Sequence, residues 1–202
     1  QLVGDTNAQV AKQFLLSVDA AYQYGGSVKQ LNKTLDGMNA IENNYATSIE
    51  KMSAGLGKVA PLAKIAHVGV DELTAALGTI TATTQRSGEE AATALRALFL
   101  NIMGDTKTEI EDGATWTAGE IEGLRDIMMQ YIPEIVNEAD RLGQVINPME
   151  AIGALAQAYK DGTLKEAELV EQINDIGGKL RSVQLTALIK NWDMYESMLN
   201  TY

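Results

Sequence analysis

The 202-residue sequence contains one histidine, His67, and no cysteine, so the side chains most often used in catalysis and metal binding are scarce. A zinc hydrolase of the His-Glu-x-x-His type needs two imidazoles one helical turn apart, which a single histidine excludes. No Gly-x-Ser-x-Gly nucleophile elbow occurs either. We interpret His67 as a residue at the C-terminal end of a helix, where its cationic form suits the helix dipole.

Pairs of carboxylates are the next candidates, because acid and base groups across a glycosidic bond need two such side chains. The pairs comprise Glu109, Glu111 and Asp112, and then Glu120 and Glu122. No apolar pocket or sugar-stacking platform is evident beside them to raise one pKa, and no acidic loop has calcium-ligand spacing. We therefore expect solvated surface here, and in the whole chain no catalytic residue, no metal site and no cofactor-binding site.

Glycine patterns give no nucleotide site. Gly55-Leu56-Gly57 lacks the third glycine of a dinucleotide-binding motif, and no Gly-Lys-Ser/Thr phosphate loop occurs. Because this run lies inside a helical pattern, we expect its glycines to permit close packing between helices.

Methionine and aromatic residues are candidates for partner binding, since thioethers adapt to varied apolar surfaces. We expect the eight methionines, among them Met128, Met129, Met194 and Met198, mainly to fill the core. Trp192, Tyr195 and Tyr202 fit a docking face and a buried anchor equally well.

Composition limits the function classes. Acidic residues exceed basic ones to give a net charge of −11, which repels phosphate backbones, so no nucleic-acid binding is expected. The most apolar run, 91–103, is shorter than the roughly 20 residues of a membrane span and contains Arg96. No transmembrane segment is therefore expected. The lack of cysteine suits a reducing compartment.

Apolar residues recur at intervals of three and four, which predicts amphipathic helices. In the first half we expect a helix over 7–24, ended by Gly25 and Gly26, and then a short helix from Val28 to Met38 that is weakened at Gly37. A third helix should begin at a Thr47/Glu50 capping box and end at Gly69, with a kink at Pro61. A fourth should begin at Asp71. Ser87 and Glu90 form a second capping box, and Gly88 lets the backbone turn tightly between them. Leu95 and Phe99 follow on one apolar face and are expected in the core.

The second half continues this pattern. The expected helices span about 119–131, 133–142 and 148–160, and the last of these has Asn147 as its N-cap and Pro148 in its first turn. The next helix begins at a capping box formed by Thr163 and Glu166. A final helix follows Gly177-Gly178 and runs from Lys179 to about Leu199.

The expected fold is all-α, an irregular bundle of about nine short helices, with residues 108–117 compatible with one small hairpin. We divide the chain into an N-terminal helical arm (1–27), a helical core (28–103), a linker (104–118) and a C-terminal helical subdomain (119–202).

A longer pattern lies in the run Lys58 to Met103, KVAPLAKIAHVGVDELTAALGTITATTQRSGEEAATALRALFLNIM. A helix leads into Gly-Val-Asp-Glu-Leu, a second helix follows, and Arg-Ser-Gly-Glu-Glu-Ala opens an apolar third. In this order the run resembles the core region of phage tail tape measure proteins. The segments around Asn43-Asn44-Tyr45 and from Gly177 to Trp192 are also similar to that family, so the resemblance covers about 28–202.

The resemblance implies a non-enzymatic structural component of a phage or prophage tail, a fragment of the minor tail protein that sets tail length and lies in the tube lumen. Implied partners are the tail tube protein, tail assembly chaperones and baseplate proteins, with host bacterial cytoplasm as the place of assembly. The residues alone leave alternatives open. A helical protein-protein adaptor of the bacterial cytoplasm would have the same composition. A fragment of a peptidoglycan-cleaving enzyme is the less favoured alternative, because it needs a carboxyl group of raised pKa in a deep cleft. The sequence also allows the chain to form a homo-oligomer.

Overall fold

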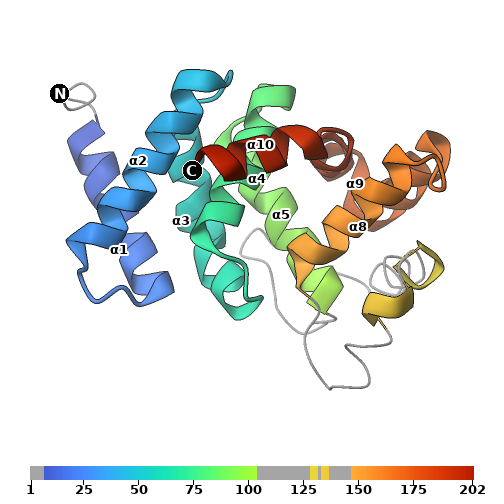
Figure 1. Cartoon of the computed structure of the whole chain (residues 1–202), viewed down its shortest axis with the longest axis horizontal. Coiled ribbons are helices and arrows are strands. Elements are labelled where there is room, and N and C mark those ends of the chain that lie inside the picture. The colour runs from blue at the N-terminus through green and yellow to red at the C-terminus, as the bar shows by residue number, and fades with distance from the viewer. Residues whose placement is uncertain (1–6, 104–127, 132, 137–146) are drawn as a thin grey trace. The chain divides into compact units, whose positions relative to one another are not determined.

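A computed structural model describes residues 7–103, 128–131, 133–136 and 147–202 (Figure 1). Every regular element in these ranges is a helix, which confirms the all-α class for this part of the chain. The labelled helices are α1 (Asn7–Tyr22), α2 (Val28–Asn44), α3 (Ile49–Ile65), α4 (Val70–Thr84), α5 (Gly88–Met103), α8 (Pro148–Lys160), α9 (Glu166–Lys190) and α10 (Trp192–Thr201). Residues 128–131 and 133–136 are helical, as expected, whereas the hairpin near 108–117 and the linker 104–118 lie outside the described residues.

Two compact units make up the chain. The first unit comprises Gln1–Thr93 together with Asp193–Tyr202, and the second comprises Ala94–Trp192. The first unit is therefore completed by a segment from the far end of the sequence. The domain boundaries drawn from the sequence at 27, 103 and 118 stay a prediction.

α4 forms the centre of the first unit. Ten of its residues between Val70 and Thr81 are buried. Three of them are threonines, and each threonine hydroxyl donates a hydrogen bond to the backbone carbonyl four residues earlier, at 2.6 to 2.9 Å. These bonds satisfy the buried hydroxyls within the helix itself, so α4 can be surrounded by other helices without leaving polar groups unpaired.

The capping box expected at Thr47 and Glu50 is wrong by one residue. Ser48 is the N-cap of α3, and its hydroxyl accepts a hydrogen bond from the Lys51 backbone N–H at 3.2 Å. The Thr47 hydroxyl instead lies 2.6 Å from the hydroxyl of Thr81 on α4. A tertiary partner therefore takes the side chain that local spacing assigned to the helix end.

Two further helix ends differ from expectation. α3 ends at Ile65, whereas Gly69, expected as its stop, is the N-cap of α4 and donates its backbone N–H to the Glu72 carboxylate at 2.7 Å. The Thr163/Glu166 box is also wrong. Lys165 is the N-cap of α9, and its backbone N–H donates to the Glu168 carboxylate at 3.3 Å. In both places a glutamate at the third helical position satisfies an otherwise unpaired amide.

Glycine stops helices less often than expected. α2 continues through Gly37 to Asn44, and α9 continues through Gly177-Gly178 over 25 residues, so it is not one of the short helices expected. The break between α9 and α10 falls at Asn191, whose side-chain amide donates to the Ala187 carbonyl at 2.7 Å. Glycine inside a helix costs about 1 kcal/mol relative to alanine, which tertiary packing can offset.

Candidate functional site

The chemical candidates from the sequence do not assemble into a reactive site in the described residues. The carboxylates Glu109, Glu111, Asp112, Glu120 and Glu122 lie outside those residues. Within the part of the chain that the structure describes, no group of three or more His, Asp or Glu side chains could hold a metal ion. No helix in that same part is long and apolar enough to span a membrane.

His67 is exposed and lies just beyond Ala66, the C-cap of α3, with φ +60°. This place agrees with its interpretation as a residue at a helix C-terminal end. Its neighbour Val68 is the residue fixed by a tertiary contact, because the Val68 carbonyl accepts a hydrogen bond from the Tyr22 hydroxyl at 3.1 Å. The bond joins the end of α1 to the α3–α4 connection.

Gly55 of the Gly-Leu-Gly run has the packing role expected of it. A Cβ at Gly55 would lie 2.7 Å from the carbonyl oxygen of Gly88 and 2.7 Å from Cδ2 of Leu77, so α3 meets the start of α5 and α4 at this point. Gly57 is exposed, and a Cβ there would have nothing nearer than Ser17 Oγ at 3.9 Å. Close packing therefore explains the first glycine of the run and not the second.

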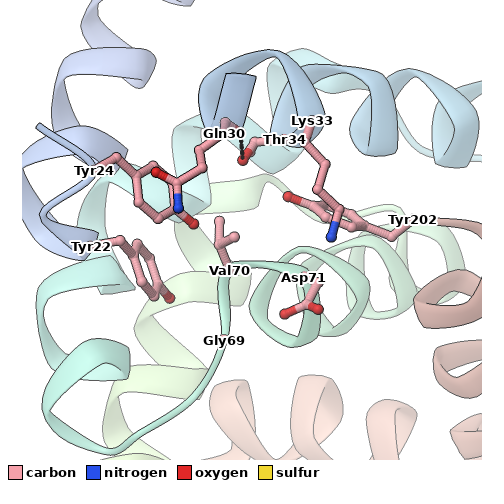
Figure 2. A pocket seen from close by; sticks show the side chains of 9 residues that line it. All are labelled: Tyr22, Tyr24, Gln30, Lys33, Thr34, Gly69, Val70, Asp71 and Tyr202. Carbon is pink, nitrogen blue, oxygen red and sulfur yellow. Dashed lines mark hydrogen bonds between the residues drawn. The ribbon is translucent and has the colours of Figure 1, made fainter. Parts of the chain in front are cut away.

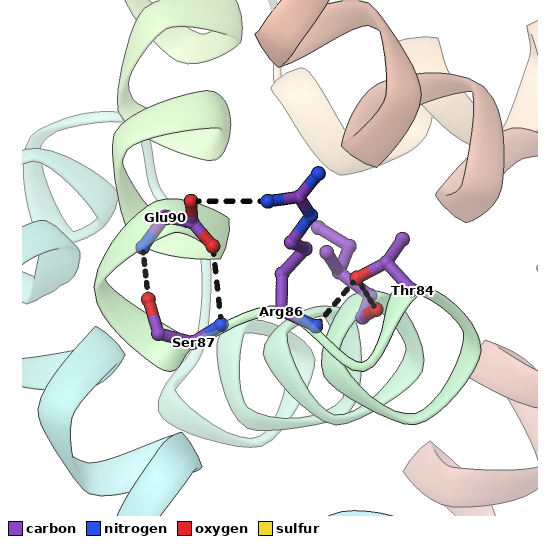
Figure 3. A network of polar contacts seen from close by, with 5 residues as sticks. Thr84, Arg86, Ser87 and Glu90 are labelled. Atoms are coloured by element: carbon purple, nitrogen blue, oxygen red, sulfur yellow. Dashed lines mark hydrogen bonds and ion pairs between the residues drawn. The ribbon is translucent and has the colours of Figure 1, made fainter.

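The Ser87/Glu90 capping box is confirmed and forms the polar network in Figure 3. The Ser87 hydroxyl accepts from the Glu90 backbone N–H at 3.2 Å, and the Glu90 carboxylate accepts from the Ser87 backbone N–H at 3.3 Å. Arg86 lies 3.6 Å from the same carboxylate, while its backbone N–H donates to the Thr84 hydroxyl at 3.3 Å. The ion pair is exposed and adds little, so the reciprocal cap determines where α5 begins.

We expect Ser87→Ala to lower the free energy of unfolding by about 0.5–2 kcal/mol, because the Glu90 amide loses its acceptor at the helix start. Ser87→Asp should retain most of that stability, since a carboxylate accepts the same hydrogen bond. Chemical denaturation followed by circular dichroism measures both variants. Equal loss in the two variants would show that the hydroxyl does not act as the cap.

A cleft of about 260 Å³ lies in the first unit where the end of α1, the first turns of α2, the start of α4 and the C-terminal residue meet (Figure 2). Its lining residues are Tyr22, Tyr24, Gln30, Lys33, Thr34, Gly69, Val70, Asp71 and Tyr202. The volume is below the roughly 300–1,000 Å³ of small-molecule sites.

Aromatic rings and opposite charges line this cleft. The rings of Tyr22 and Tyr24 stack with centroids 6.0 Å apart, and the Lys33 ammonium lies 5.6 Å from the centre of the Tyr202 ring. Burial raises the pKa of the Tyr22 and Tyr202 hydroxyls above the ordinary phenol value, which itself lies well above 7, so both phenols are neutral at pH 7. A neutral phenol is a poor base and a poor nucleophile, and Lys33 together with Asp71 leaves no single sign of charge to select a ligand.

Sequence reasoning did not identify the cleft, because its walls come from positions as distant as 22 and 202. The only signal was the undecided role of the C-terminal aromatic residues. Tyr195 has only 3% of its surface exposed, so its ring is a buried anchor and not part of a docking face. Met128 and Met198 are buried as expected for core methionines, whereas Met129 is 39% exposed.

These features together define an all-α protein. In the residues that the structure describes, the polar clusters cap helices and join one helix to another. Residues 2–178 match the family model described as phage-related minor tail protein. Because the match spans well over half of the sequence, the chain belongs to the phage-related minor tail protein family. Membership gives the protein a structural role in a phage tail. Comparison with curated proteins and with solved structures gives no match.

Proposed function

We propose that the chain is part of a tape measure protein, which lies in the lumen of the tail tube and sets the length of the tail. The supporting observation is the family match over 2–178, which includes the whole Lys58–Met103 run that resembles the tape measure core. That run contains the second half of α3, all of α4 and all of α5.

The mechanism of length control is geometric. A helical segment extends by about 1.5 Å per residue and an extended segment by up to about 3.3–3.6 Å per residue. A tube that polymerises around such a chain stops where the chain ends, so its length follows the number of residues enclosed. This role needs length and helical structure and no catalytic group.

The partners in this proposal are the tail tube protein, the assembly chaperones and the baseplate proteins, met first in the host cytoplasm and then in the virion tail. Buried α4 and the Gly55–Gly88 contact support a second part of the proposal. Residues 58–103 act as a folded anchoring element, whereas spacer helices elsewhere in the full gene product supply the length.

The test is a set of in-frame deletions in the phage gene, with tails measured in electron micrographs. Removing about 100 residues of spacer should shorten the tail by about 150 Å if the spacer is helical, and by up to about 330–360 Å if it is extended. Deletions inside 58–103 serve as the comparison and should abolish tail assembly rather than shorten the tail.

Unchanged tail length after the spacer deletions would reject the tape measure proposal and favour the helical adaptor. Cleavage of peptidoglycan by the purified chain would reject both structural roles in favour of an enzyme.

A further inference from the structure

The cleft in Figure 2 is lined by two opposite charges that come from different helices. Lys33 lies on α2, and Asp71 lies in the first turn of α4. The Lys33 ammonium contacts the ring of Tyr202, a cation–π contact of about 0.5–1 kcal/mol at an exposed site. Among the described residues, neither charge has an ion-pair partner. Each can therefore pair with a ligand group of the opposite sign.

The Asp71 carboxylate is held in place by the start of α4. Its Oδ1 accepts a hydrogen bond from the Glu72 backbone N–H at 3.0 Å. A Cβ at Gly69 would collide with the same oxygen, so glycine at the N-cap leaves the room that the carboxylate occupies. The position of this charge is thus fixed before a ligand arrives, which lowers the ordering cost of binding.

The Tyr202 hydroxyl is buried and points into the cleft (Figure 2). Burial raises its pKa more than the nearby Thr34 hydroxyl lowers it, so the phenol keeps its proton and can donate it. The Thr34 hydroxyl itself donates to the Gln30 carbonyl at 3.1 Å. Within the described part of the chain, the Tyr202 hydroxyl makes no hydrogen bond of acceptable geometry. Buried polar groups without a partner are rare in native proteins, and an acceptor on a ligand would supply one here.

The other side of the cleft is aromatic and apolar. The rings of Tyr22 and Tyr24 stack there, and the Val70 side chain lies between these rings and Asp71 (Figure 2). The cleft of about 260 Å³ is smaller than sites that hold drug-sized ligands. A matching ligand is therefore small and has one anionic group, one cationic group and an apolar part.

We propose that the cleft binds a small zwitterion, an α-amino acid with an apolar side chain. The ligand carboxylate pairs with Lys33 and accepts a hydrogen bond from the Tyr202 hydroxyl. The ligand ammonium pairs with Asp71, while its side chain lies against Tyr22 and Tyr24. A ligand of one sign alone would meet a like charge, and a neutral sugar would form no ion pair with either residue. This inference is independent of the tape measure role.

Calorimetric titration of the purified chain with L-phenylalanine tests the proposal. Its methyl ester lacks the carboxylate, and N-acetyl-L-phenylalanine lacks the ammonium. We expect saturable binding of L-phenylalanine and about tenfold or weaker binding of each derivative, because a hydrogen bond to a charged group is lost. No saturable binding of L-phenylalanine, or derivatives that bind as tightly as the parent, would overturn the proposal. Tighter binding of glucose, a neutral sugar, would overturn it as well.

Two variants place this binding in the cleft. Lys33→Met and Asp71→Asn each remove one charge with little change in size, and each should weaken L-phenylalanine binding about tenfold or more. In Lys33→Met, the difference in affinity between L-phenylalanine and its methyl ester should shrink, since the partner of the carboxylate is gone. A difference as large as in the unmodified chain would contradict the assigned role of Lys33.

The matched controls are Lys29→Met and Asp36→Asn, because both residues are exposed on α2 and neither lines the cleft. Both controls should leave the affinity unchanged, and a loss equal to that of the cleft variants would overturn the proposal. If circular dichroism shows that Asp71→Asn unfolds α4, Lys33→Met decides, since Lys33 is exposed and caps no helix.

Discussion

Alanine in place of Gly88 should destabilise the protein by about 3 kcal/mol or more, the upper end of the cost of overpacking. An added Cβ would overlap the backbone carbonyl group of Lys51, whose carbon lies only 2.6 Å from the Cβ position, and it would approach the Gly55 backbone nitrogen to 3.1 Å. Backbone atoms in the first two turns of α3 cannot move aside as a flexible side chain can. The start of α5 must therefore separate from α3, which removes the contact on which both helices depend.

Gly57→Ala is the matched control, since Gly57 lies on the same helix as Lys51 and Gly55, and a Cβ there has nothing nearer than Ser17 Oγ at 3.9 Å. An exposed helical glycine replaced by alanine should gain about 0.5–1 kcal/mol. Denaturation midpoints of the two variants should move in opposite directions. A loss below about 1 kcal/mol in Gly88→Ala would mean that α3 and α5 do not meet at this point.

Gly88 also shows what sequence reasoning can and cannot provide. We expected glycine here because the backbone turns tightly, yet the glycines with positive φ are Gly25, Gly26 and Gly162 among the described residues. Gly88 is needed because a neighbouring helix leaves no room for a side chain. Local pattern identified the residue, but the physical reason depends on a contact with Lys51 that lies far away in the sequence.

Helix positions were predictable where both partners of a local interaction are close in sequence. The Ser87/Glu90 box is correct, and Asn147 caps α8 by accepting from the Met149 and Glu150 backbone N–H groups, with Pro148 in the first turn. Thr47 failed because Thr81 of α4 competes for its hydroxyl. Spacing alone cannot show such a competitor.

The cleft and the packing of α10 against α2 and α4 could not be predicted for a related reason. Both bring the last residues of the chain against α2 and α4, and helical periodicity shows only which face of a segment is buried. Gly37 illustrates the limit, because we interpreted it as weakening a short helix, whereas Tyr202 covers it within a helix of 17 residues. Glycine at a close contact and glycine at a helix end look the same in one sequence.

Phe99→Ala should lower the free energy of unfolding by about 3–5 kcal/mol. Phe99 and Leu95 are four residues apart on α5, and both side chains have 0% of their surface exposed, as the apolar periodicity predicts. Removing the ring loses its transfer free energy and also leaves a cavity, because close-packed neighbours relax only in part.

Ile65→Ala is the comparison for this loss, because Ile65 is also a large apolar residue on a helix but is 63% exposed. Its replacement should change stability by no more than about 0.5 kcal/mol, as is usual for surface positions. Equilibrium denaturation of the two variants under one set of conditions separates burial from the general effect of truncating an apolar side chain. A loss below about 1 kcal/mol for Phe99→Ala would mean that the apolar face of α5 is open in solution, and that face would then be a site for a tail partner rather than part of the core.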